Sequence, residues 1–243
     1  MEIFSQAGGE MLSRWGHYLS GVTWIGLLYY FNFVQVPSFA EFEAAGRTEA
    51  IRKLVPRALW WFRFGAMFTL LTGVMILGFQ DNLTGGEYFK TAPGIAISTG
   101  ILLALVMFGN VFGVIWPNQK RVIANAERVA AGGETDPAAA VAGRRALLAS
   151  RTNAFLSIPM LWFMGVTSHL AAREYEITPA GGERGLYWLI TLALVVAFEL
   201  NGLGKIGGPG PGPTKVYLEE HPKTIMAGFG LWLVFVVLWE VLF

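Results

Sequence analysis

The sequence predicts an all-α polytopic membrane protein, built as a six-helix transmembrane bundle. Of its 243 residues, 54% are hydrophobic and only 14% are charged, and the mean hydropathy is +0.49. A water-soluble globule of this size needs more polar surface than that composition supplies, so lipid is the expected solvent. The formal net charge is only +1, and the basic residues are dispersed among the connecting segments. This pattern gives no indication of a nucleic-acid partner.

Six apolar segments are long enough to cross the hydrocarbon layer of a bilayer. A layer of about 30 Å needs roughly 20 apolar residues at 1.5 Å each. The whole chain, 1–243, is therefore expected to form a single integral membrane domain. The expected spans are residues 14–36, 57–79, 92–116, 152–172, 185–204 and 224–243.

The longer polar connections predict helices outside the bilayer. Pro37 and Pro56 bound a stretch that is expected to form an amphipathic interfacial helix, with Ser38 as its N-cap. After the third span, the polar residues 118–131 and a second segment that begins near Asp136 predict a cytoplasmic helical hairpin.

The distribution of basic residues predicts the orientation. The three connections on one side carry 13 of the 18 Lys and Arg residues, against four on the other side. Cytoplasmic loops retain the excess of Lys and Arg, so both termini are expected outside. The expected location is the bacterial inner membrane, crossed several times.

Two histidines are expected near the outer ends of their spans, His17 in the first and His169 in the fourth. Histidine is costly in hydrocarbon and usually faces the bundle interior, where it pairs or binds something. A matched pair is the arrangement that holds a b-type haem through two axial imidazoles. Close backbone approach and flat apolar surface are expected from nearby glycines and aromatic residues: Gly16, Gly21, Gly26, Gly165, Trp15, Trp24, Trp162 and Phe163.

Two further observations bear on this haem hypothesis. The chain has no cysteine, which excludes iron–sulfur clusters and c-type haem attachment within it. The alternative is that each histidine only hydrogen-bonds to a neighbouring helix, or anchors its helix at the membrane interface. His221 is expected in water on the inner surface.

A second group of polar residues is expected in the cytoplasmic half of the bundle. Such residues are rare in membrane spans without partners. Arg63 and Glu199 are the expected ion pair. The group serves either to fix the packing or to form a proton or substrate path, and its members are Asn32, Arg63, Asn110, Glu199 and Asn201.

Four segments together resemble the membrane domain of the bacterial cytochrome-linked urate oxidases, the urate oxidase N-terminal family. They are HYLSGVTWIGLLYYFNFVQVP, WWFRFGAMFTLLTG, GVIWPNQKRVIANAE and ASRTNAFLSIPMLWFMGVTSHL. The His-x6-Trp-x-Gly pattern in the first span is also similar to the first helix of the bacterial membrane protoporphyrinogen oxidases, in which a histidine binds haem. The resemblance supplies no catalytic residues.

The resemblance implies an integral membrane oxidoreductase that oxidises urate and passes electrons to a c-type cytochrome. Members of the family usually carry that cytochrome as a fused C-terminal domain. This chain has no CxxCH motif, so a separate cytochrome is expected.

Two other functions stay open at this point. The chain could be a non-catalytic accessory transmembrane subunit of a larger respiratory or photosynthetic complex, which needs no haem. A transporter would be favoured by an inverted repeat of three plus three spans, but the two halves of the sequence show no such similarity.

Overall fold

The computed structural model describes residues 2–83, 86–170 and 178–243, and these residues form helices, turns and loops with no strand among them. The chain divides into two compact units. Unit 1 comprises Met1–Leu83 and Phe108–Ser150, and unit 2 comprises Thr84–Met107 and Arg151–Phe243. Each unit is described separately below.

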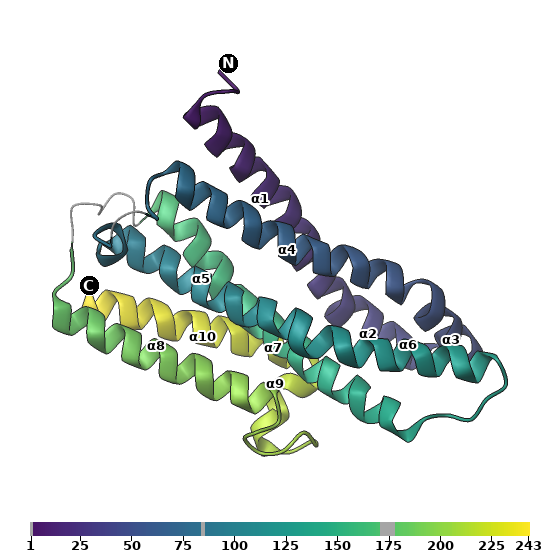
Figure 1. The fold of residues 1–243 in the computed structure, drawn as a ribbon. Coiled ribbons are helices and arrows are strands. Elements are labelled where there is room, and N and C mark those ends of the chain that lie inside the picture. The colour runs from purple at the N-terminus through teal and green to yellow at the C-terminus, as the bar shows by residue number, and fades with distance from the viewer. Residues whose placement is uncertain (1, 84–85, 171–177) are drawn as a thin grey trace. The chain divides into compact units, whose positions relative to one another are not determined.

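Unit 1 is built on two long helices, α1 (Gln6–Tyr29) and α4 (Val55–Phe79), which lie side by side (Figure 1). The Ser5 hydroxyl caps α1 by accepting a hydrogen bond from the Gly8 amide at 3.1 Å. Gly65 of α4 lies so close to α1 that a Cβ there would be 3.1 Å from the Trp24 amide nitrogen. Small residues that allow such backbone approach are typical of helix pairs in membranes.

Among the described residues, two helices continue through a proline by way of a π-helical turn. Tyr30–Gln35 joins α1 to α2 (Val36–Glu41), and Val111–Ile115 joins α5 (Ala92–Asn110) to α6 (Trp116–Ala130). Each turn ends one residue before an X-Pro pair. A proline has no N–H and its ring clashes with the carbonyl four residues earlier, and the extra residue of a π turn absorbs that defect.

The polar connections differ in detail from the sequence predictions. Ser38 lies inside α2 and is not an N-cap, because the helix continues through Pro37. The expected interfacial helix is two helices, α2 and α3 (Ala44–Lys53). The hairpin is present, but its two arms are the continuation of α5 into α6 and the first turns of α7 (Pro137–His169).

Unit 2 has an aromatic core between α8 (Gly181–Gly202), α10 (His221–Leu242) and the parts of α5 and α7 that belong to it. Phe155 of α7 contacts Phe198 at a ring-centroid distance of 4.7 Å. Phe163 contacts Phe235 of α10 at 5.8 Å. The short helices of this unit are the 3-10 turns Tyr88–Lys90 and Pro213–Lys215 and helix α9, Val216–Glu219.

Four helices in the described residues are long and apolar enough to cross a membrane, and this supports the membrane class of the protein. They are Val55–Phe79, Ala92–Ala130, Gly181–Gly202 and His221–Leu242. The first and fourth expected spans fall largely within α1 with its π-helical extension and within α7, both helical but outside that group. The count of six spans and the orientation therefore stay predictions.

We expect Gly228→Ala to lower the stability of unit 2. A Cβ at Gly228 would be 2.5 Å from Ile158 Cδ1 and 3.0 Å from the carbonyl oxygen of Phe155. That carbonyl is fixed backbone, and overpacking of this kind costs about 1–3 kcal/mol. The measurement is the thermal midpoint of the purified protein in detergent. Gly230→Ala on the same helix is the matched control, because a Cβ there meets nothing within 4 Å; equal midpoints for the two variants would contradict the close α7–α10 contact.

Candidate functional site

The ring of His17 lies between α1 and α4, in unit 1. Its Nδ1 is 3.2 Å from the Thr72 hydroxyl oxygen, and that hydroxyl is itself 2.6 Å from the Phe68 carbonyl oxygen. A hydroxyl has one proton, and Thr72 donates it to the Phe68 carbonyl, which is the shorter of the two contacts. Thr72 therefore accepts from the Nδ1–H of His17, and Nε2 keeps its lone pair.

His169 is the last residue of α7, in unit 2, and its side chain is exposed. Its Nδ1 is 3.0 Å from the Gly165 carbonyl oxygen. A carbonyl can only accept, so Nδ1 carries the proton and the neutral ring keeps the lone pair on Nε2. The two histidines thus share one tautomer, although they belong to different units.

An open hollow of about 250 Å³ lies beside His169 on one face of α7. A Cβ at Gly165 would meet nothing within 4 Å, so this glycine leaves the face flat. The side chains that line the hollow with His169 and Gly165 are apolar: Leu161, Trp162, Val166 and Leu170.

The aromatic residues expected around the histidines separate into two kinds. Trp15 is 59% exposed and Trp162 is 39% exposed, so both offer surface outside their unit's core. Trp24 and Phe163 are buried, at 2% and 1% exposure, and their rings serve the helix packing.

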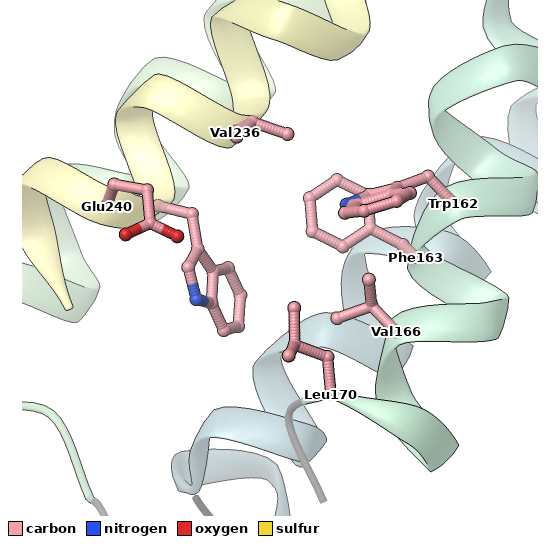
Figure 2. Close-up of a pocket in the computed structure, with 7 residues that line it drawn as sticks. Trp162, Phe163, Val166, Leu170, Val236 and Glu240 are labelled. Carbon is pink, nitrogen blue, oxygen red and sulfur yellow. The ribbon is translucent and has the colours of Figure 1, made fainter.

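A smaller cavity of about 30 Å³ lies between α7 and α10 in unit 2 (Figure 2). Trp162, Val166 and Leu170 line this cavity as well as the hollow beside His169. Figure 2 shows the Glu240 carboxylate of α10 at its edge, among otherwise apolar side chains.

Three members of the expected polar group lie in unit 1. Asn32 is 1% exposed, and its amide nitrogen donates to the Leu28 carbonyl and to the Ser150 hydroxyl, each at 2.8 Å. Asn110 is also buried. The Arg63 guanidinium carbon is 3.5 Å from the ring centroid of Trp116.

The other two members, Glu199 and Asn201, lie in unit 2 near Tyr217. The Tyr217 hydroxyl donates to Asn201 Oδ1 at 3.0 Å. Burial raises the pKa of Tyr217 to about 12, and the negative charge of Glu199 adds to the shift. The phenol therefore stays neutral and able to donate at neutral pH. Because Arg63 and Glu199 belong to different units, their ion pair stays a prediction.

Two buried cations of unit 2 were missed by the sequence analysis, which placed both in water-facing connections. Arg151 is 3% exposed, and its Nη1 donates to the Leu218 carbonyl at 3.0 Å. Lys215 is 0% exposed, and its Nζ donates to the Ile206 carbonyl at 2.7 Å. The apolar residues on both sides of Arg151 were an available signal of burial, whereas the glycine- and proline-rich stretch before Lys215 carries none.

The comparison with protein families gives one match: residues 86–197 match the model described as urate oxidase N-terminal. Over this stretch, a little less than half of its length, the chain is similar to the urate oxidase N-terminal family. The match confirms the resemblance found from the sequence and indicates a membrane oxidoreductase-like domain. The comparisons with curated proteins and with solved structures gave no match.

The matched stretch contains two of the four sequence segments on which the resemblance was based. It includes the motifs at residues 113–127 and 149–170, and therefore His169, Asn110 and the hollow on α7. His17 and Arg63 lie before the matched stretch.

Proposed function

We propose that this chain is a membrane oxidoreductase subunit of the urate oxidase type, which binds one b-type haem and passes electrons to a c-type cytochrome. His17 and His169 are the residues that would hold the haem. The protein spans the bacterial inner membrane six times, with both termini outside. The family match over residues 86–197 supports the oxidoreductase class.

The observation that carries the proposal is the state of the two imidazoles. Each donates from Nδ1 to an oxygen of its own unit, Thr72 Oγ1 for His17 and the Gly165 carbonyl for His169. Metal-ligating histidines almost always make such a second hydrogen bond, which sets the tautomer and makes the other nitrogen a better ligand. The imidazole at each position therefore has the donor chemistry of a residue that would hold haem iron.

The surroundings of His169 also fit a flat apolar group. The hollow of about 250 Å³ runs along α7 beside the ring, and Gly165 places no side chain in it. Trp162 offers an indole at the same face. A haem bound here supplies one-electron redox chemistry at its iron.

The chain's own residues have three tasks in this proposal. Thr72 holds the ring orientation of His17, and the last turn of α7 holds that of His169 through the Gly165 carbonyl. The apolar side chains that line the open hollow would contact a bound haem and lower the local dielectric, which tunes its redox potential. The substrate-binding residues are unassigned.

The activity is tested with the purified protein, oxidised c-type cytochrome and urate, with oxygen excluded. We expect urate to lose electrons to the cytochrome, seen as growth of the reduced cytochrome's α band, and we expect His169→Ala to stop this growth. His221→Ala is the control and should keep the activity, because His221 begins α10 outside the proposed site. Urate-dependent reduction at the wild-type rate in His169→Ala would contradict the proposal. A haem-free, inactive wild-type protein would instead favour the accessory-subunit alternative.

A further inference from the structure

Two cations of unit 1 meet on one indole ring. The Arg63 guanidinium carbon lies 3.5 Å from the ring centroid of Trp116, and the Lys120 ammonium lies 5.5 Å from the same centroid. Arg63 comes from α4, whereas Trp116 and Lys120 are one turn apart on α6. The three side chains thus bring two positive charges to one flat apolar surface.

Within the described residues of unit 1, no carboxylate forms an ion pair with Arg63 or Lys120. The ion pairs of the neighbouring α3 involve Arg52 and Lys53, which both meet Glu49. Arg63 uses its Nε to donate to the Leu59 carbonyl at 3.3 Å. Its terminal N–H groups remain available in the fork geometry that binds carboxylate or phosphate oxygens in pairs.

The position along the helices indicates the depth of this site. Arg63 lies eight residues into α4, about 12 Å from its first residue, and α4 is one of the helices able to cross a membrane. Trp116 stands where α5 and its π turn pass into the polar α6. Tryptophan is enriched at the membrane interface, and the long Arg and Lys side chains reach from apolar surroundings to that level.

We propose that Arg63, Trp116 and Lys120 form a binding site for a phosphate group, as carried by the headgroup of a phospholipid. Arg63 holds two phosphate oxygens through its terminal N–H groups, and Lys120 adds a second positive charge. The indole of Trp116 packs on the apolar part of the lipid next to the phosphate. Two cations facing one phosphate favour a lipid with net negative charge over a zwitterionic one.

The test measures lipid retention by native mass spectrometry of the full-length protein, delipidated in non-ionic detergent. The probes are phosphatidylglycerol, phosphatidylcholine and inorganic phosphate. The variants are Lys120→Gln, Arg63→Gln and, as the matched control, Arg121→Gln, an exposed neighbour of Lys120 on the same helix. A melting curve for each variant checks its fold, and Lys120→Gln is decisive because Lys120 is exposed.

We expect the wild type to retain phosphatidylglycerol better than phosphatidylcholine. Lys120→Gln should weaken this binding about five-fold, the change that loss of one basic residue near an anionic lipid brings, and Arg63→Gln at least as much. Arg121→Gln should bind like the wild type. Competition by millimolar inorganic phosphate would support the phosphate site and identify free phosphate as its source, whereas no competition identifies the lipid. Equal retention of phosphatidylglycerol by the wild type, Lys120→Gln and Arg63→Gln would overturn the proposal.

Discussion

Alanine at either His17 or His169 is expected to remove the b-type haem bands from the purified protein. Each replacement removes one of the two imidazoles that would hold the haem in the proposed function, and a haem that loses one of its two protein ligands is held less tightly. Both variants should still insert in the membrane, because neither histidine supplies the apolar area that drives insertion.

The matched control is His221→Ala, which should keep the wild-type spectrum. A second variant, Thr72→Val, separates positioning from ligation. It removes the oxygen that accepts from His17 Nδ1 and leaves the ligand in place, so we expect haem to be retained with a shifted reduction potential. A wild-type spectrum in both alanine variants would show that other residues hold the haem.

Arg151→Leu is expected to destabilise unit 2 by about 2–3 kcal/mol, because the buried Leu218 carbonyl loses a charged donor. Neighbouring groups that interact with this guanidinium lose their partner at the same time. The measurement is thermal unfolding in detergent, where this loss should lower the midpoint by several degrees.

Arg151→Lys is the informative comparison for that prediction. It keeps the positive charge and loses the planar fork, so its midpoint should fall between those of the wild type and Arg151→Leu. Arg121→Gln, at an exposed position of α6, should leave the midpoint unchanged. A midpoint for Arg151→Leu equal to that of the wild type would contradict the structural role of this buried cation.

Hydropathy was sufficient to find the helices but not their ends. The apolar runs of α4, α8 and α10 predicted these helices to within a few residues. The helices that contain Pro37 and Pro117 were predicted to stop there, because proline normally ends or kinks a helix. Both helices continue through a π turn. Such a turn adds one residue, which only shifts the spacing of the apolar residues along the helix, so the hydrophobic pattern of the sequence does not reveal it.

The candidate site was predictable in residue type and only partly in environment. The spacing in the sequence singled out His17 and His169, but the tautomer of each ring depends on Thr72 and on the Gly165 carbonyl, which only the fold brings to Nδ1. Trp24 and Phe163 were expected to offer open surface, but both are buried. Packing against neighbouring helices decides which face of a helix turns inward, and the sequence alone did not show this for these two residues. Arg151 and Lys215 were assigned to water because a charge lowers local hydropathy whether or not it is paired.

The most direct test of the haem proposal is the reduced-minus-oxidised absorption spectrum of the wild-type protein, purified from cells supplied with haem precursor, together with its haem content per chain. We expect sharp α and β bands of a low-spin b-type haem and a content near one haem per chain. A protein whose melting curve shows that it is folded, but which carries no porphyrin under these conditions, would contradict haem binding by this chain.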